Sequence, residues 1–167
     1  MCYENKLFFS PKIMTTYKDG QFQNDSTIKH FEFKDNDQLA KDLFLNCKNM
    51  TFDHLPLVEI IPEYCFVNCK CQKHVIIPET VKKIGECAFL NCRNITKITL
   101  NEGLEELEGY VFEGTGIKEI ELPSTLTKFD YTIVSDCDDL EIIRVKNEEQ
   151  KQKLKIHERY GIKIEIM

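Results

Sequence analysis

The chain has 167 residues, of which 42% are apolar and 30% charged, and its 28 acidic and 22 basic residues give a formal net charge of −6. This composition predicts one ordinary globular domain and excludes a collagen-like protein, a disordered protein and a membrane channel. Because no apolar run approaches the roughly 18 residues of a spanning helix and an acidic surface repels a phosphate backbone, we expect no membrane insertion and no nucleic-acid partner. The first residues lack the basic and long apolar regions of a signal peptide, which favours a cytoplasmic location.

The first 26 residues contain apolar side chains that do not follow the spacing of the rest of the chain. These side chains include Leu7, Phe8, Phe9, Ile13, Met14 and Phe22. The polar stretch 23–26 is typical of a join between structural units. We therefore predict that residues 1–26 form an N-terminal cap.

Residues 27–146 repeat one pattern every 22 or 23 residues. The string Phe-x-Asn-Cys occurs with its phenylalanine at Phe44, Phe66 and Phe89, and Phe112 and Val134 continue the same step. An alternating apolar pair, a turn residue and two further apolar columns keep this register. Self-similarity at such a period indicates a solenoid, here of five to six coils.

Each coil is expected to contribute one short strand, because apolar residues alternate in pairs such as Ile98 and Leu100. The residues between and beside these pairs should then face outward from the concave side of a parallel sheet. They are His74, Ile76, Lys97, Thr99, Glu119, Glu121, Ile142 and Arg144, with Glu32 in an earlier coil. An exposed Ile76 or Ile142 would favour contact with a partner, and a cap that covers them is the alternative.

The Phe-x-Asn-Cys string is interpreted as architecture. The phenylalanines fill the wide end of the coil, and the cysteine acts as a small apolar side chain. The asparagine can hydrogen-bond turn backbone, so that a ladder is expected down the stack. Its members would be Asn46, Asn68, Asn91 and Asp136.

Residues 147–167 break the period. Asn147 followed by Glu148 and Glu149 predicts a helix start, and Gly161 predicts a left-handed stop. We predict a helix over 148–160 and a strand over 162–166. Together they would form a C-terminal cap over the open end of the last coil.

The repeat unit, Φ-x-Φ-P-x-x-Φ-x-x-Φ-x-x-x-x-F-x-N-C, resembles the BspA-like (Treponema-type) leucine-rich repeat family, with the clearest matches over 77–92 and 122–126. The resemblance implies an α/β repeat solenoid, wound as a right-handed coil with a short-strand parallel sheet on its concave side. It also implies protein or ligand binding, often at cell surfaces in bacteria and in some anaerobic protists. Gly114 and Thr115 replace Asn-Cys, and Asp53 falls where a buried strand residue belongs, so we expect distorted coils there.

The densest group of possible metal ligands or reactive thiols is Cys65, Cys69 and Cys71, with His74 nearby. A zinc or redox site is one interpretation, and buried core thiols are the other. The spacing contains no C-x-x-C pair, and Cys69 belongs to the repeating column, so we favour core thiols. The serines and histidines lie in none of the usual catalytic motifs. We expect no enzyme activity, no metal and no cofactor.

These features are typical of a non-enzymatic protein-protein interaction module that presents the solenoid surface to an unidentified protein or peptide. A pre-ordered strip loses little entropy on binding. The eight strand residues are the expected strip, and the convex side and the N-terminal cap are alternatives. A cell-surface adhesin-like ligand-binding protein is a second interpretation, and a thiol or metal protein using Cys65, Cys69 and Cys71 is a third. The oligomeric state does not follow from the sequence.

Overall fold

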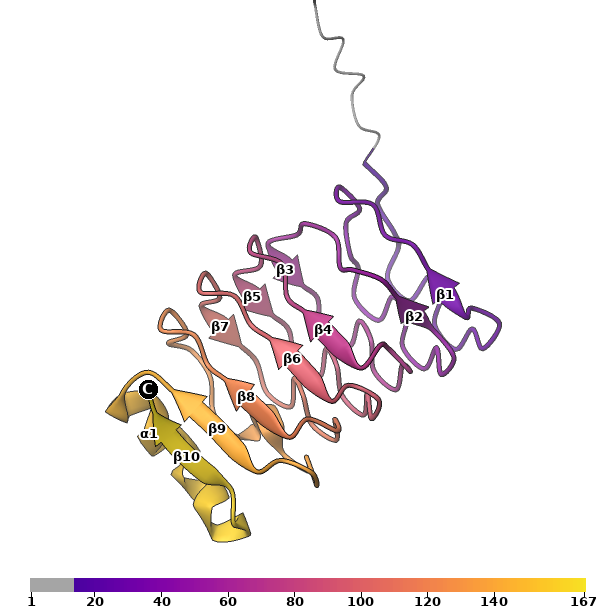
Figure 1. Ribbon diagram of the computed structural model, residues 1–167. Helices are drawn as coiled ribbons and strands as arrows, with labels where there is room; N and C mark the ends of the chain where they lie inside the picture. Colours follow the sequence, from indigo (N-terminus) through magenta and orange to yellow (C-terminus); the bar gives the residue numbers. More distant parts are fainter. Residues whose placement is uncertain (1–13) are drawn as a thin grey trace, which may run out of the picture.

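Residues 14–167 are described by a computed structural model, in which successive coils stack along one axis as a repeat solenoid (Figure 1). One row of parallel strands contains β1 (His30–Phe31), β2 (Thr51–Phe52), β4 (His74–Ile76), β6 (Lys97–Thr99), β8 (Glu119–Glu121), β9 (Ile142–Val145) and β10 (Lys163–Ile166). A second row contains β3 (Ile60–Ile61), β5 (Lys83–Ile84) and β7 (Glu106–Leu107). The fold class predicted from the sequence is confirmed.

The second row of strands was not predicted. It carries the inward apolar column of Ile61, Ile84 and Leu107, all buried, which the sequence shows only as a repeated position. Each of these strands has two residues. Two residues are too few to display the alternation that identifies a strand in a sequence.

The phenylalanines form a single file through the core, as the repeat predicts. Phe44 and Phe66 stack with ring centroids 5.8 Å apart, and Phe66 and Phe89 with centroids 5.2 Å apart. Phe112 continues the file 6.0 Å beyond Phe89. Phe22 stacks on Phe44 at 5.2 Å and so begins the file one coil earlier than expected.

The segment before residue 26 therefore contains a turn of the repeat type. Gly20 and Asn24 have the same left-handed backbone as their counterparts 22 residues later, Asp42 and Asn46. The prediction that this stretch lacks the repeat is wrong at Phe22, because its spacing from Phe44 is a full period and only the flanking residues differ. The apolar residues Leu7, Phe8, Phe9 and Ile13 lie outside the described residues, so the boundary of an N-terminal cap stays a prediction.

The asparagine column has a conformational cause that the sequence interpretation missed. Its members all have a positive φ of 50–65°: Asn24, Asn46, Asn68, Asn91, Gly114 and Asp136. Asn, Asp and Gly are the residues that adopt this left-handed region most readily. Gly114 therefore fits the turn, and Phe89 and Phe112 still stack at this coil, although their rings are 6.0 Å apart and inclined by 24°, against 5.2 Å and 10° for Phe66 and Phe89.

The asparagine side chains bond to one another. Asn46 Nδ2 donates to Asn24 Oδ1 at 2.9 Å, and Asn68 Nδ2 donates to Asn46 Oδ1 at 2.6 Å. A ladder therefore exists over the first three coils, although its bonds join side chains and not the turn backbone. Gly114 has no side chain with which to continue it, and Asn91 Oδ1 lies 2.5 Å from where a Cβ on Gly114 would be.

The cysteine column combines small size with hydrogen bonding. Each thiol donates to the carbonyl oxygen of the phenylalanine in the preceding coil: Cys47 to Phe22, Cys69 to Phe44, Cys92 to Phe66 and Cys137 to Phe112, over 2.9–3.1 Å. The interpretation of these residues as purely apolar was therefore incomplete. A thiol is small enough for the coil and still satisfies a buried carbonyl.

The register near Asp53 differs by one residue from the prediction. Phe52, and not Asp53, takes the inward strand position, where it is 2% exposed and pairs with Phe31. Asp53 is exposed and lies 3.5 Å from His30. The coil is regular because the step from this column to Val75 is 23 residues.

The C-terminal cap contains α1 (Glu148–Leu154), the 3-10 helix η2 (Lys155–Tyr160) and strand β10. Asn147 caps α1 by accepting from Gln150 N–H, and Gly161 has the left-handed φ of 82° that ends η2. The second half of the predicted helix is thus a 3-10 helix, whose tighter winding accompanies the bond between His157 Nε2 and Tyr131 O at 2.7 Å. The predicted strand is confirmed, and it pairs in parallel with β9.

Gln150 explains how the cap closes the last coil. Its Nε2 donates to Pro123 O and Leu126 O at 2.9 and 3.1 Å. In the preceding coil Asn101 Nδ2 donates in the same way to Pro78 O and Val81 O. The helix therefore supplies hydrogen bonds of the kind that Asn101 makes to the coil before it. Within residues 14–167, no helix has the length and apolar character needed to cross a bilayer.

Candidate functional site

The outward side chains of the first row of strands form one continuous surface, here named the strand face. It contains the eight predicted residues, His74, Ile76, Lys97, Thr99, Glu119, Glu121, Ile142 and Arg144. Six are exposed, and Ile142 and Arg144 are half-buried. The strand register places His74 beside Lys97 on β4 and β6, and Glu119 beside Ile142 on β8 and β9. The structure thus brings the predicted residues together.

The half of the strand face near the C-terminus is a network of ion pairs. Arg144 contacts Glu119 at 2.7 Å and Glu165 of β10 at 3.5 Å, and Lys146 contacts Glu121 at 2.7 Å. The bond to Glu119 raises the pKa of the Arg144 guanidinium, and the bond to Glu121 raises that of Lys146. Exposed pairs of this kind contribute little to stability, so their main effect is to fix the positions of the charges.

The other half of the strand face is polar around one exposed apolar side chain. His74 Nε2 and Thr99 Oγ1 form a hydrogen bond of 2.9 Å across β4 and β6. Ile76, in register with Thr99, is 59% exposed. Ile142, by contrast, is flanked on both sides by strands β8 and β10 and is half-buried. The cap therefore covers Ile142 in part and leaves Ile76 open.

The second row of strands presents a different surface that sequence reasoning missed. Its centre is an ion-pair cluster in which Lys83 contacts Glu106 at 3.0 Å and also contacts Glu108. Leu57 and Ile60 at its N-terminal edge are 53% and 52% exposed. The column spacing could have located this surface if each repeated position had been tested for a second strand.

The cysteines among residues 14–167 are core thiols. The seven cysteines among residues 14–167 are free and buried, and Cys2 lies outside the described residues. Hydrogen bonds with Cys69 and Cys92, together with burial, raise the pKa of Cys71, and burial raises that of Cys65. A raised pKa keeps a thiol protonated and weakly nucleophilic.

The same group does not assemble a metal centre in the described part of the chain. No cluster of three or more His, Cys, Asp or Glu side chains suited to a metal ion occurs between residues 14 and 167. His74 points away from the neighbouring cysteines, since it is exposed on the strand face and bonded to Thr99. Cys71 Sγ lies 3.7 Å from Cys92 Sγ inside the core. These thiols pack between coils.

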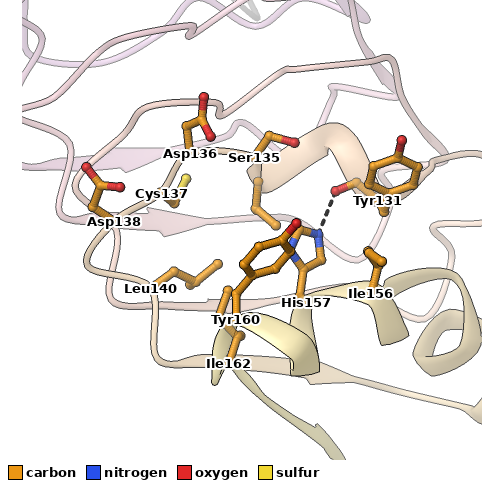
Figure 2. Close-up of a pocket in the computed structure, with 11 residues that line it drawn as sticks. Tyr131, Ser135, Asp136, Cys137, Asp138, Leu140, Ile156, His157, Tyr160 and Ile162 are labelled. Atoms are coloured by element: carbon orange, nitrogen blue, oxygen red, sulfur yellow. Dashed lines mark hydrogen bonds between the residues drawn. The ribbon is translucent and has the colours of Figure 1, made fainter.

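A cavity of about 330 Å³ lies at the C-terminal end of the stack (Figure 2). It is bounded by the last turn of the solenoid, which includes the 3-10 helix η1 (Tyr131–Val134), and by η2 of the cap. Sequence reasoning missed it, because its shape depends on how the cap settles against the last coil.

Stacked coils with short parallel strands, a phenylalanine file and left-handed asparagine turns define the protein as a leucine-rich-repeat solenoid. The chain belongs to the family described as BspA type leucine rich repeat region, whose model matches residues 1–56 and 59–159 with six copies. This confirms the family resemblance inferred from the repeat. Proteins of this family are generally interaction or adhesion modules.

Three solved structures resemble the fold. A leucine rich cell surface protein from Faecalibacterium prausnitzii has a TM-score of 0.61 and 19% identity, over 91% of this chain and 51% of that one. A leucine-rich repeat protein from T. pallidum has a TM-score of 0.49 and 14% identity, over 91% of this chain and 74% of that one. A leucine-rich repeat protein from Bacteroides ovatus has a TM-score of 0.40 and 13% identity, over 92% of this chain and 64% of that one. The chain spans about half the length of the first structure. A search of the curated proteins gave no match.

Proposed function

We propose that the chain is a non-enzymatic protein-interaction module whose strand face binds a segment of a partner protein. The observation that carries the proposal is Ile76, which lies on β4 in the N-terminal half of the strand face, is 59% exposed, and has beside it Thr99, a polar neighbour already held by His74. The hydrogen bond of His74 with Thr99 and the ion pair of Arg144 with Glu119 order the face before any partner arrives. Such pre-ordering reduces the entropy lost on binding.

The energetics favour Ile76 as the anchor and the charged residues as determinants of specificity. Full burial of an isoleucine side chain contributes about 1.5–3 kcal/mol, so covering the exposed part of Ile76 would contribute about 1–2 kcal/mol. A contribution above about 1 kcal/mol is made by only a minority of the residues in an interface. Glu119 and Arg144 satisfy each other in the free protein. They would therefore select for charge complementarity more than they would add affinity.

The proposal is tested with two matched isoleucine variants. Ile76→Ser removes the apolar side chain from the strand face, and Ile60→Ser removes a similarly exposed isoleucine from the other row of strands. The partner is first identified by affinity capture from the native cell, and its affinity for each variant is then measured by calorimetry. We expect Ile76→Ser to weaken binding about tenfold, which corresponds to about 1.4 kcal/mol, and Ile60→Ser to leave it unchanged. Weaker binding by Ile60→Ser and unchanged binding by Ile76→Ser would instead place the binding site on the second row of strands.

A cell-surface adhesin-like protein is the alternative, and the name of the Faecalibacterium prausnitzii structure supports it. The cytoplasmic location expected from the sequence stays a prediction. Labelling of intact native cells with a membrane-impermeant amine reagent separates the two. Labelling of this chain would establish the surface location, and protection that is lost on cell lysis would establish the interior one.

A further inference from the structure

Strand β10 is the outer strand of the first row and has an open edge. It pairs with β9 on one side, and no strand lies on its other side within residues 14–167 (Figure 1). The N–H groups of Lys163 and Met167 donate to carbonyl oxygens on the β9 side, over 2.8 and 2.9 Å. Because backbone groups alternate along a strand, those of Ile164 and Ile166 point away from β9. An edge with such unpaired groups is a template for a further strand.

The same edge leaves apolar side chains incompletely covered. Ile164 is 6% exposed, whereas Ile166 and Met167 at the end of the strand are 48% and 52% exposed. Ile162 lies on the same side of the sheet as Ile164 and Ile166 and is half-buried. A strand added to this edge would therefore cover apolar surface as well as pair the backbone.

The outward side chains of β10 make the strand complementary to itself. Lys163 and Glu165 carry opposite charges on the strand face, and their side chains are 69% and 32% exposed. In an antiparallel pair that places Ile164 opposite its own copy, Lys163 falls opposite Glu165 of the second copy, on both sides of the two-fold axis. Directly opposite residues have Cβ atoms roughly 4.5–5.5 Å apart, which is within reach of an ion pair.

Charge also disfavours the neighbouring register. An axis centred on Glu165 would still bring the unpaired backbone groups of the two edges together, but it would place Glu165 opposite its own copy. Like charges in that position are destabilising. The register centred on Ile164 avoids this repulsion, and it places Ile162 opposite Ile166 of the second copy. Backbone, apolar and charged groups therefore favour one register.

We propose that β10 pairs in antiparallel fashion with β10 of a second copy of this chain, about a two-fold axis at Ile164. The pairing is closed, because each copy uses the edge that the other needs, so the assembly stops at two chains. The strand faces of the two copies would continue across the axis as one surface. The dimer does not depend on a partner binding at Ile76, so this proposal and the proposed function are tested separately.

The first test is the mass of the 167-residue chain by sedimentation equilibrium, from about 1 µM to about 1 mM, which brackets dissociation constants in the micromolar range. We expect the mass to rise with concentration from the 19.6 kDa of one chain to twice that value. The mass of a single chain throughout would overturn the proposal, and the edge of β10 would then be left for a strand of another protein.

Charge reversal tests the register. Lys163→Glu and Glu165→Lys each place like charges opposite one another in a dimer of identical chains, and each should weaken the dimer about tenfold or more. In a mixture of the two variants opposite charges face each other again, so a mixed dimer should form as tightly as the unaltered one. Damage to the fold of either variant could not be rescued by mixing. Lys97→Glu makes the same charge change on β6, two strands away from β10, and should have no effect.

A backbone variant tests the edge itself. Ile166→Pro removes an N–H that points away from β9 and leaves the bonds of Lys163 and Met167 to the β9 side in place; proline is tolerated on such an edge. It should abolish the dimer, whereas Ile166→Val should retain it. A dimer that persists in Ile166→Pro, that the single charge reversals leave unchanged, or whose loss is not rescued by mixing would in each case overturn the proposal.

Discussion

The centre of the phenylalanine file is where a single truncation should do most damage. Phe66 is fully buried and stacks on Phe44 and Phe89 at 5.8 and 5.2 Å, and it also contacts Phe52 at 5.3 Å. Truncation of a buried phenylalanine to alanine costs about 3–5 kcal/mol, and each aromatic pair adds about 0.5–1.5 kcal/mol beyond its area. We expect Phe66→Ala to lose about 4–5 kcal/mol, a large share of the 5–15 kcal/mol that is usual for a folded domain.

The end of the same file supplies the control. Phe22 is half-buried and stacks on one neighbour in the column, Phe44. We expect Phe22→Ala to cost about half as much as Phe66→Ala. Urea unfolding followed by circular dichroism gives both free energies, with the slope of the transition as a check on cooperativity. Equal losses for the two variants, or a loss below about 1.5 kcal/mol for Phe66→Ala, would refute the interpretation of the file as the energetic centre of the fold.

Three further predictions concern the ends and turns. Gln150→Ala removes the hydrogen bonds to two backbone carbonyls of the last coil and should lower the free energy of urea unfolding by about 2 kcal/mol. Gln152 is exposed, so Gln152→Ala should cost almost nothing. Equal losses in the two variants would contradict the capping role. Gly114 has a φ of 65°, so Gly114→Ala should destabilise the protein by about 1–2 kcal/mol. Gly114→Asn should destabilise it by less, since asparagine tolerates this left-handed region. The reverse ranking would contradict backbone conformation as the reason for glycine at this position. Burial raises the pKa of Cys47 to about 11 in the folded protein, whereas a thiol in the unfolded chain has a pKa near 8.5. The unfolded chain therefore ionises first, and the free energy of unfolding falls from about pH 8.5 to 11. The fall in that free energy between pH 7.5 and 10 should be smaller in Cys47→Ala, and an unchanged fall would contradict this contribution.

The repeating columns of the fold could be predicted because each coil must bury the same faces against its neighbours. The spacing of Phe44, Phe66, Phe89 and Phe112 was sufficient to place them in one file, since any other register would expose them. The same reasoning placed the outward residues of the strand face, because side chains alternate along a strand. The binding role of that face remains a separate question that the repeat does not address.

Features that depend on backbone angles or on contacts between distant segments were beyond the sequence. The left-handed turn at Asn46 and Asn68 follows from φ, which the motif alone does not report, so these residues were interpreted only as hydrogen-bonding groups. The two-residue strands of the second row lack a pattern of their own. The cavity beside Asp136 arises where the cap meets the last coil, and its shape depends on packing between segments that no periodicity relates.

The way in which the cap is attached bears on how long such a protein can be. Gln150, Lys153 and His157 all bond to main-chain carbonyl oxygens of the final coil, on Pro123, Leu126, Thr127 and Tyr131. Carbonyls in these places exist whatever the local amino acids are. Duplicating an internal unit of 22 or 23 residues would therefore lengthen the array without requiring a new terminator, and coil number could vary among descendants while the same ending is reused.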